Sequence, residues 1–526
     1  MTQLHELILG SAESWPDADA LLFKDEKLNY GDLVGQLSRI GHFYRDLGLE
    51  PGDRVAVYLE KRPETVIALY AASAAGMIFV PINPLLKPAQ VLYILRDCNV
   101  RMLVTSADRL KLLSEILPAC PDLEHIIIIE KYDDQPLPGK NVHHWDTAPT
   151  PDTCLGKTGD DQSLASILYT SGSTGNPKGV VLSHRNMVLG AESVAQYLCN
   201  HERDRLLAVL PFSFDYGLSQ LSTAFYKGGA AVLMNYLLPR DVIRAVARYQ
   251  ITGLAAVPPL WIQLAQLDWP ESVHGHLRYL TNSGGAMPQV TLQALRTKLP
   301  KSDFFLMYGL TEAFRSTFLP PDLINERPGS IGQAIPHAEV LVVREDGSPC
   351  EADEVGELVH TGELVAQGYW QDEEKTRKRF RPTPAHATQT NANNHAVWSG
   401  DHVKRDADGY LYFVGRNDDM IKTSGYRVSP DEVEEILFEN ETVGEVAVIG
   451  IPHPELGQAI VVFVSPVANQ VCQAEQLIAE CRYKLPTFMV PAHIDIRDTL
   501  PKNPNGKIDR NLLTDSIKNM FQEQSA

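Results

Sequence analysis

The sequence has 526 residues, a length that predicts roughly two to four compact units rather than a single core. Hydrophobic residues make up 44% and charged residues 21% of the chain, an ordinary globular composition that excludes a chain without a folded core. The 66 Asp and Glu outnumber the 47 Lys and Arg, which gives a net charge of −19, and such an acidic balance argues against a nucleic-acid-binding protein.

The cysteines and the first residues predict a cytoplasmic protein. The seven cysteines are scattered and form no C-x-x-C pair, a pattern typical of reduced thiols in the cytosol. The sequence does not open on a basic segment followed by an apolar core, so we expect no signal peptide. The longest apolar stretch, residues 66–82, contains Ser73 and Gly76, so we expect a buried helix and strand there rather than a membrane span.

Residues 50–260 alternate between short apolar runs and helical stretches. The short apolar runs predict buried strands at 55–59, 102–105, 126–129, 231–234 and 254–257. Because strands and helices alternate, the sequence predicts the α/β class, with doubly wound and largely parallel sheets.

Past about residue 335 the pattern changes. Residues 339–344 and 356–365, separated by a turn at 345–348, predict antiparallel strands, and we expect a small β-barrel-like subdomain over about 335–415. Residues 381–395 are rich in Pro, Thr and Asn and show no periodicity, so they predict a surface loop.

A further unit is expected to begin near residue 418. Ser429 followed by Pro430 is a typical helix start, with Ser429 as the capping residue and Glu432 as the acidic residue of a capping box. Strand-like runs follow at 445–449 and 460–464. The sequence therefore predicts a large N-terminal domain over 1–417 and a small, mobile α+β domain over 418–526.

The strongest local signal is the stretch Tyr169–Gly179, YTSGSTGNPKG. Its glycines let backbone N–H groups approach an anion, its hydroxyls add donors and Lys178 adds a positive charge, which together suit a polyphosphate. The stretch departs from the Walker pattern, since Pro177 precedes the lysine and Gly179 follows it. A flexible Ser/Gly loop is the alternative interpretation.

Four further motifs follow along the chain. They are SGGA at Ser283–Ala286 with YGLTE at Tyr308–Glu312, WSGD at Trp398–Asp401 with Gly415 and Arg416, the stretch Asp418–Val428, and Leu500–Lys507. Taken alone, each has a plain structural interpretation, such as a helix start for YGLTE or a solvated turn between domains for 418–428.

In this order, the five motifs resemble those of the adenylate-forming superfamily, which includes acyl-CoA synthetases, amino-acid adenylation domains and firefly-type luciferases. The resemblance covers essentially the whole chain. It implies that ATP and Mg²⁺ serve to activate a small-molecule carboxylic acid as acyl-AMP with release of pyrophosphate. The acyl group would then pass to a thiol, either of coenzyme A or of a carrier-protein phosphopantetheine.

The resemblance also implies a role for each matching residue of the nucleotide site. The phosphate loop would include Thr170, Ser171, Gly172, Ser173, Thr174 and Gly175. Adenine would lie between Tyr308 and the backbone of Gly284, Gly285 and Ala286. Thr311 would meet a phosphate and Glu312 would bind Mg²⁺. Asp401 would hold the ribose, with Arg416 and Arg427 near ribose or phosphate. Trp398 and Ser399 stand where His-Thr is common, a departure that leaves Asp401 in place.

Four further positions carry the implied mechanism. Lys507 matches the catalytic lysine, whose ammonium offsets the charge that develops when the carboxylate attacks the α-phosphate, with Lys178 assisting. Asp418 matches the hinge about which the small domain would rotate between the two steps. Lys422 and Gly425 would line the thiol tunnel.

The implied acid pocket includes Phe214, Asp215, Tyr216, Ser283 and Arg315. Phe214-Asp215 is similar to amino-acid adenylation domains, in which the Asp pairs with the α-amino group of the substrate, so we favour an acid that bears an amino group. The alternative is that Asp215 and Arg315 pair with each other or face the protein interior.

Other readings of the whole chain stay open. Details around Phe214 and Glu312 resemble bacterial acyl-CoA ligases associated with exosortase A systems, which suggests an acyl carrier protein as a partner. An amino-acid-activating enzyme that loads a separate carrier protein is the main alternative, and a luciferase-like oxygenase is a second. A nucleotide sensor without catalysis is a third, but Lys178, Glu312 and Lys507 are all in place, which argues against it.

Overall fold

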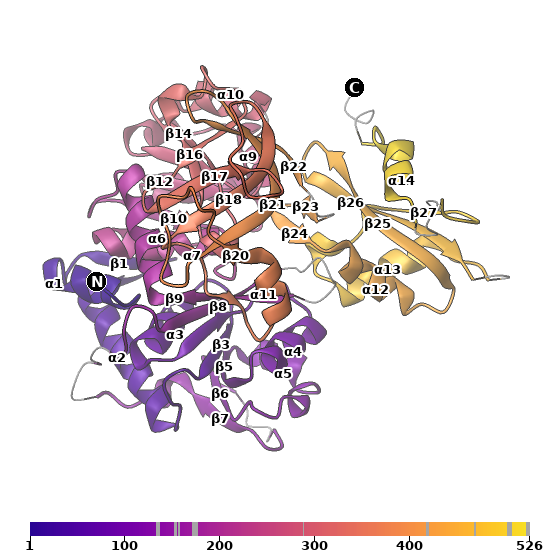
Figure 1. Ribbon diagram of the computed structural model, residues 1–526. Coiled ribbons are helices and arrows are strands. Elements are labelled where there is room, and N and C mark those ends of the chain that lie inside the picture. The colour runs from indigo at the N-terminus through magenta and orange to yellow at the C-terminus, as the bar shows by residue number, and fades with distance from the viewer. Residues whose placement is uncertain are drawn as a thin grey trace.

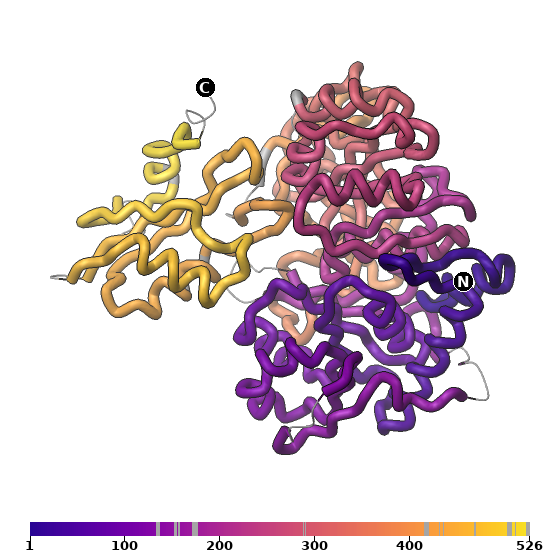
Figure 2. The backbone as a smooth tube through the Cα atoms, turned by 180° about the vertical axis from the view of Figure 1, so that it is seen from behind, coloured from indigo at the N-terminus to yellow at the C-terminus, as the bar shows by residue number. Residues whose placement is uncertain are grey.

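The computed structural model of the protein describes residues 1–132, 137–151, 155, 158–170, 177–287, 289–416, 420–467, 470–501 and 508–521. Figure 1 shows two large layered parts, one above the other, and a smaller C-terminal part at their side. Figure 2 shows the same arrangement from behind, with the C-terminal part again beside the junction of the other two.

The sheet of the N-terminal part is built mainly of parallel strands. Its strands are β3 (Arg54–Tyr58), β4 (Ile78–Pro81), β5 (Val100–Thr105), β6 (His125–Ile128), β7 (Asn141–His144), β8 (Leu164–Thr170), β9 (Lys178–Ser183) and β19 (Gly368–Tyr369). They lie in the order β19-β9-β8-β4-β3-β5-β6-β7, and only the pairings at β9 are antiparallel among the strands described. Because helices cover both faces, the strands are continuous apolar runs. The predicted strands at 55–59, 102–105 and 126–129 are confirmed as β3, β5 and β6.

The second sheet begins as a parallel sheet and continues as an antiparallel one. Its strands are β1 (Asp19–Phe23), β2 (Glu26–Asn29), β10 (Arg205–Ala208), β11 (Ala230–Leu233), β12 (Gly253–Ala256), β13 (Tyr279–Asn282), β14 (Asp303–Tyr308), β15 (Thr317–Leu319), β16 (Ser330–Ala334), β17 (Ala338–Val343), β18 (Val355–Gly362), β20 (Phe380–Pro382), β21 (His395–Arg405) and β22 (Leu411–Arg416). The order is β17-β18-β21-β22-β16-β15-β14-β13-β12-β10-β11-β1-β2, with β20 beside β21.

The change from parallel to antiparallel pairing falls at β14. Strands β11, β10, β12, β13 and β14 pair in parallel, whereas β15 pairs antiparallel with both β14 and β16. The predicted antiparallel strands past residue 335 therefore continue the edge of the parallel sheet. Residues 381 and 382, which we expected in a loop, belong to β20, because Arg381 and Pro382 pair with β21.

The helices pack on the faces of these two sheets. They are α1 (Glu6–Ser14), α2 (Tyr30–Asp46), α3 (Pro63–Ala75), α4 (Pro88–Asp97), α5 (Ala107–Leu113), α6 (His184–Tyr197), α7 (Asp215–Lys227), α8 (Pro239–Arg248), α9 (Pro258–Ala265), α10 (Gln289–Lys298) and α11 (Glu373–Arg379). Nearly every residue of α3 is buried, and β4 follows it, so residues 66–82 form the predicted buried helix and strand. A search of the described residues finds no helix long and apolar enough to cross a membrane.

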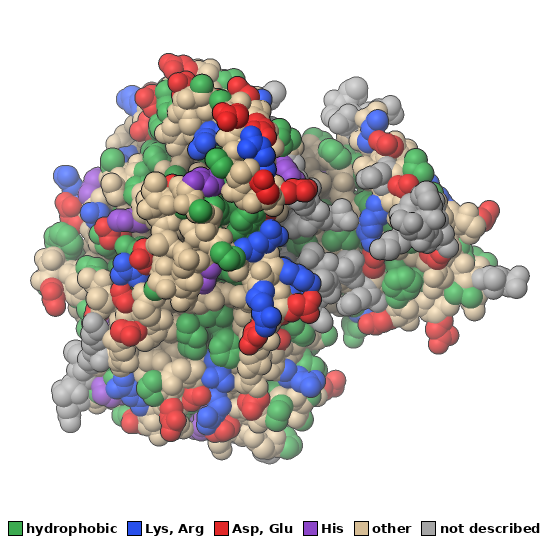
Figure 3. Space-filling view, viewed as in Figure 1, with side chains coloured by type: hydrophobic (Ala, Val, Ile, Leu, Met, Phe, Trp, Pro, Cys, Tyr) green, Lys and Arg blue, Asp and Glu red, His purple; other side chains and the backbone are tan. Residues whose placement is uncertain are grey.

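The C-terminal part has a sheet and a core of its own. Its elements are β23 (Ile421–Thr423), β24 (Tyr426–Val428), α12 (Pro430–Phe438), β25 (Val443–His453), β26 (Gly457–Pro466), α13 (Ala474–Lys484), β27 (His493–Ile496) and α14 (Arg510–Ile517). Apolar residues of α12 and α13 pack on one side of the sheet, and Leu513 of α14 packs in a separate cluster with Phe463. Figure 3 shows acidic and basic side chains interspersed over the face seen in Figure 1.

Candidate active site

The predicted site residues gather where the two large sheets and the C-terminal part meet. Thr170 ends β8, Tyr308 ends β14, and Ser283 directly follows β13. All three therefore lie at the carboxyl ends of strands, which is where open α/β sheets bind ligands. The C-terminal part contributes Gly425 and Arg427, which line a cavity together with Thr170 and Ser283.

The structure fixes both ends of the predicted phosphate loop. Thr170 on β8 lies opposite Lys178 on β9, as the last pair of an antiparallel ladder. The Lys178 ammonium lies 5.0 Å from the centroid of the Tyr369 ring. Of the predicted loop residues, Ser171, Gly172, Ser173, Thr174 and Gly175 lie outside the described residues. The ladder therefore holds the two ends of the loop close together and places its lysine at the site.

Glu312 is a buried carboxylate surrounded by positive charge. The hydroxyl of Tyr369 donates a hydrogen bond of 2.7 Å to its Oε1 atom, and Arg379 Nε lies 3.8 Å from the same oxygen. Burial by itself raises the pKa of Glu312, but the charges of Arg379 and Arg427, the Tyr369 hydrogen bond and the charge of Lys178 together lower that pKa to about 2. Glu312 is therefore ionised and offers the hard oxygen ligand that Mg²⁺ prefers.

Asp401 and Tyr308 form a buried pair. The Tyr308 hydroxyl donates a hydrogen bond to Asp401 Oδ2, and Asp401 is only 1% exposed. The backbones of Asp401 and Arg416 pair across β21 and β22, whereas the side chain of Arg416 is not described. The predicted adenine platform and the predicted ribose ligand thus lie side by side.

Arg427 reaches this region from the C-terminal part of the chain. Burial by itself lowers the pKa of the Arg427 guanidinium, but the carboxylates of Asp401 and Glu312 outweigh burial and raise that pKa. Arg427 therefore brings a permanent positive charge from β24 to the predicted nucleotide site. Asp418 and Lys507, which we predicted as hinge and catalytic lysine, lie outside the described residues.

A cavity of about 160 Å³ lies beside the end of the phosphate loop. Its wall includes Phe214, Asp215, Tyr216, Ser283 and Thr311. Four of the five residues that we predicted for the acid pocket are therefore brought together around one cavity.

Asp215 places a carboxylate in the wall of this cavity. It is the first residue of α7, so the amide dipoles of the helix favour a negative charge there. The Thr311 hydroxyl donates a hydrogen bond of 3.1 Å to Asp215 Oδ1. Burial raises the pKa of Asp215, and the Arg315 charge and the Thr311 bond only partly offset this effect.

Arg315 lies behind the cavity wall. Its guanidinium stands 4.5 Å from the centroid of the Tyr216 ring and donates a hydrogen bond of 3.3 Å to Ser219 Oγ. The preceding residue, Phe314, has φ 58° and ψ −63°, a strained turn that directs Arg315 into the protein. Within the described ranges, no ion pair joins Arg315 to Asp215, so the two residues do not pair directly with each other.

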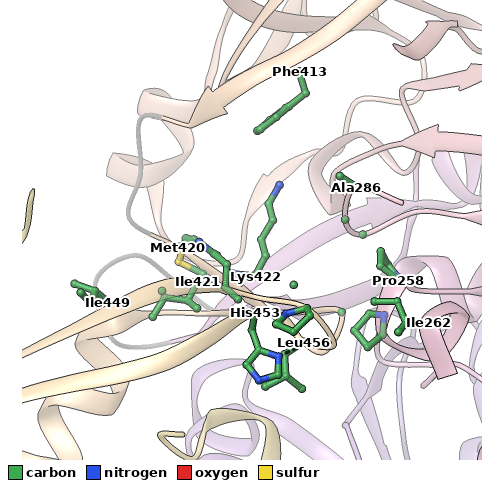
Figure 4. A pocket seen from close by; sticks show the side chains of 18 of the residues that line it. Pro258, Ile262, Ala286, Phe413, Met420, Ile421, Lys422, Ile449, His453 and Leu456 are labelled. Atoms are coloured by element: carbon green, nitrogen blue, oxygen red, sulfur yellow. Dashed lines mark hydrogen bonds between the residues drawn. The ribbon is translucent and has the colours of Figure 1, made fainter. Parts of the chain in front are cut away.

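A second, larger cavity of about 830 Å³ lies between the C-terminal part and α9. Figure 4 shows Met420, Ile421 and Ile449 on one side of it and Pro258, Ile262 and Ala286 on the other, with the Lys422 side chain extending toward Phe413. Gly284 and Gly425 line both this cavity and the smaller one, which makes them the neck between the two. Gly284, Gly285 and Ala286 thus lie on the wall of the larger cavity.

The neck leaves no room for a side chain at Gly425. This residue has φ +82°, and a Cβ atom there would lie 2.7–2.9 Å from atoms of Val257. Its backbone oxygen lies 3.8 Å from where a Cβ atom of Gly284 would stand. Glycine is therefore required both by the backbone conformation and by the close approach of the two parts.

Tyr369 and Arg379 contact the site but were missed in the sequence. Both surround Glu312, although they lie 57 and more residues away along the chain. Tyr369 belongs to the two-residue strand β19, which pairs with β9 next to the phosphate loop. No local sequence pattern predicts such a short strand, and only the pairing of β19 with β9 brings Tyr369 to Glu312.

Comparison with known proteins identifies the family. Residues 10–370 match the family described as AMP-binding enzyme, and residues 432–507 match the AMP-binding enzyme C-terminal domain. The chain is 31% identical to sulfoacetate–CoA ligase from Cupriavidus necator over 96% of both chains. It is 29% identical to a segment of a linear gramicidin synthase from Brevibacillus parabrevis, over 95% of this chain and 6% of that protein.

Two structures of o-succinylbenzoate CoA synthetase from Bacillus subtilis resemble this one to different degrees. The complex of a double mutant with the product analogue OSB-NCoA has a TM-score of 0.83, at 25% identity over 97% of this chain and 98% of that one. The complex with the acyl-adenylate OSB-AMP has a TM-score of 0.68, at 26% identity over 96% and 97%. The chain therefore belongs to the AMP-binding enzyme family, and it is an AMP-forming ligase.

Proposed function

We propose that the protein activates a small carboxylic acid with ATP and transfers the acyl group to the thiol of coenzyme A. In the first step a carboxylate oxygen attacks the α-phosphorus of ATP and a P–O bond forms. The bond from the α-phosphorus to the oxygen that bridges to the β-phosphorus breaks, and pyrophosphate leaves with its electrons. In the second step a thiolate attacks the acyl carbon, a C–S bond forms, and AMP leaves with the electrons of the broken C–O bond.

The observation that carries this proposal is the pair of cavities that meet at Gly284 and Gly425. The smaller cavity reaches the end of the phosphate loop, where an acyl-adenylate would lie. The larger cavity opens between the two domains and is mostly apolar, which suits the pantetheine arm of coenzyme A. A thiol that enters through the neck would meet the acyl carbon directly. Lys422, at the wall of the larger cavity, would face the polar end of that arm.

The nucleotide would occupy the charged side of the site. Glu312 fits a Mg²⁺ site because its carboxylate is ionised and adjoins Thr311, whose hydroxyl would meet a phosphate. When bound, the ion would neutralise phosphate charge. Lys178 and Arg427 would add fixed positive charge along the phosphates. Tyr308, next to Asp401, would stack on adenine while the Asp401 carboxylate accepts the ribose hydroxyls.

We propose two domains, over 1–417 and 418–526, that meet at a hinge at Asp418. Lys507 would act in the first step and Gly425 in the second, because both belong to the domain that rotates. Two observations support assigning the arrangement described above to the second step. Gly425 lies at the neck between the cavities, and the overall likeness is greater to the product-analogue complex than to the acyl-adenylate complex of the same relative.

For the acid, we propose a short chain that bears an amino group. Asp215 lies in the wall of a cavity of about 160 Å³ and is free of any direct ion pair within the described residues. An ammonium group at this position would offset the cost of burying the Asp215 carboxylate. Arg315, behind Tyr216, would then act on Asp215 through its electric field rather than by contact.

A carrier-protein phosphopantetheine is the second candidate acceptor. Two observations favour it: the similarity to a linear gramicidin synthase, and an acidic residue at the position of Asp215. Both acceptors present the same pantetheine arm, so the apolar cavity fits either one. A luciferase-like oxygenase is a third candidate, but the neck at Gly425 gives a thiol a route to the site that such an enzyme would not need.

The test is an ATP–pyrophosphate exchange panel followed by detection of the thioester by mass spectrometry. The panel would hold acetate, propionate, hexanoate, benzoate, glycine, alanine and β-alanine, and each active acid would then be offered coenzyme A and a phosphopantetheinylated carrier protein. We expect exchange with a small amino acid and a thioester that forms without oxygen uptake. Exchange that never leads to a thioester with either acceptor, or that is coupled to oxygen uptake, would overturn the proposal.

A further inference from the structure

A polar contact joins the two proposed domains at the first turns of two helices. Gln90 lies in the first turn of α4, in the large domain, and Glu432 lies in the first turn of α12, in the small domain. Gln90 Nε2 donates a hydrogen bond of 3.0 Å to Glu432 Oε1, and the two residues are 342 positions apart in the sequence. Both side chains are half-buried, so this bond is partly shielded from water.

The large domain holds Gln90 ready for this bond. The side-chain oxygen of Gln90 accepts a hydrogen bond of 3.1 Å from the backbone N–H of Lys87, at the start of α4. That bond leaves the amide nitrogen pointing away from α4, where it also lies 3.7 Å from the sulfur of Met489 in the small domain. The amide therefore faces two partners on the other domain and is already oriented to meet them.

An aromatic stack of the small domain lies close by. The rings of Tyr426 and Phe488, both of the small domain, are parallel, with centroids 3.8 Å apart, and Tyr426 lines the smaller cavity together with Asn83 of the large domain. Tyr426 directly follows Gly425, so its position fixes the glycine at the neck between the two cavities. Gln90 and Glu432 line the same cavity, so the pair and Tyr426 lie on one surface between the two domains.

We propose that Gln90 and Glu432 form a positioning pair that holds the small domain in the arrangement for thioester formation. The inference rests on the two-step function proposed above, in which the small domain must leave this arrangement for adenylation. The pair then forms in one step and breaks in the other. A hydrogen bond between a neutral amide and a carboxylate suits this task, because it is directional and requires no buried ion pair to be separated in each cycle.

The test changes the charges of the two residues. Gln90→Glu places a second carboxylate against Glu432, and the double variant Gln90→Glu with Glu432→Lys restores an attractive pair of opposite charges. We expect Gln90→Glu to lower the ratio of thioester formation to ATP–pyrophosphate exchange about five-fold, which corresponds to ~1 kcal/mol, and the double variant to recover most of it. Both rates would be measured with whichever acid of the panel above exchanges fastest. Gln293→Glu, which adds the same charge at an exposed site on α10, is the matched control and should leave the ratio unchanged.

A measurement without substrate keeps the inference separate from the proposed function. Spin labels at Leu112 and Tyr483, exposed residues of the large and the small domain, report the interdomain distance in the full chain, once two cysteines are replaced by serine: the exposed Cys199, and Cys154, which lies outside the described residues. We expect Gln90→Glu to lower the fraction of molecules that show the interdomain distance of the present arrangement, and the double variant to restore that fraction. The positioning role is wrong if neither the distances nor the rate ratio respond to these substitutions. It is also wrong if ATP–pyrophosphate exchange falls as far as thioester formation. If no acid yields a thioester, the proposed function is wrong. The interdomain distances then still show whether Gln90 and Glu432 hold the small domain in this arrangement.

Discussion

The Tyr369 hydroxyl donates a hydrogen bond of 2.7 Å to Oε1 of Glu312 and thereby ties the strand β19, next to the phosphate loop, to the carboxylate proposed to hold Mg²⁺. The same Tyr369 ring lies under the ammonium of Lys178, at 5.0 Å from its centroid. One aromatic side chain thus orients both the anionic and the cationic member of the phosphate site.

Replacement of Tyr369 by Phe should remove the bond to Glu312 while it keeps the ring under Lys178. We expect ATP–pyrophosphate exchange to fall about ten-fold at low Mg²⁺ and to recover in part at high Mg²⁺, because the carboxylate would still be present but less well oriented. A Mg²⁺ titration of the exchange rate measures this effect. A uniform loss at every Mg²⁺ concentration would show that the hydroxyl acts elsewhere.

Glu312 should make the stability of the protein depend on pH in the acidic range. Its pKa is lowered from 4.5 to about 2 in the folded protein, so the ionised carboxylate stabilises the fold above pH 4.5, and this contribution is lost as the pH falls through 2. Between pH 4.5 and pH 2, the unfolding free energy of the Glu312→Gln variant should therefore fall by about 3 kcal/mol less than that of the unaltered protein. Urea unfolding over this pH range measures the difference, and Glu26→Gln, at an exposed site, should behave like the unaltered protein.

Lys507 should separate the two half-reactions. If its ammonium offsets the charge that develops at the α-phosphate, Lys507→Ala should abolish ATP–pyrophosphate exchange, a loss of at least about 100-fold. The same variant should still form the thioester from acyl-AMP that is supplied directly. Rapid-quench assays of each step would show this, and equal loss of both steps would contradict the role.

Much of the fold and of the site could be predicted from the sequence, because the relevant signals are local. Buried parallel strands read as continuous apolar runs, and the residues of the nucleotide site fall within short motifs at strand ends. The contacts of Glu312 could not be predicted, since Tyr369 and Arg379 reach it only through long-range strand pairing.

Two details of side-chain placement, at the start of α12 and at the turn before Arg315, could also not be predicted from the sequence. Ser429 precedes α12 as predicted, but its side chain makes no capping bond and is fully buried instead. Glu432, which a capping box would use, is the residue that binds Gln90 of the other domain. Arg315 lies behind Tyr216 because Phe314 adopts a positive φ, a conformation that no local pattern in the sequence indicates.

Asp215→Asn should change which acids are activated. Without the negative charge, an ammonium group in the cavity loses its partner, so exchange with amino acids should fall about 100-fold, while exchange with plain acids should change little. Exchange with an amino acid should also rise with pH as Asp215 ionises, since burial raises the pKa of this carboxyl. If plain fatty acids prove active and amino acids inert, the Asp215 argument fails, and Asp215→Ala should then matter little.

Gly425→Ala should impair thioester formation more than adenylation. Two effects act at this residue: φ is +82°, which strains any other amino acid, and the new methyl group would lie 2.7–2.9 Å from Val257 atoms at the neck between the cavities. Gly347→Ala is a matched control, because it has the same strain at φ +81° but its nearest neighbour, Trp398, is 3.6 Å away. We expect Gly425→Ala to slow thioester formation from supplied acyl-AMP at least ten-fold and the control to leave it unchanged. Equal effects of both variants would assign the loss to backbone strain, and the neck at Gly425 would then not be the route of the thiol.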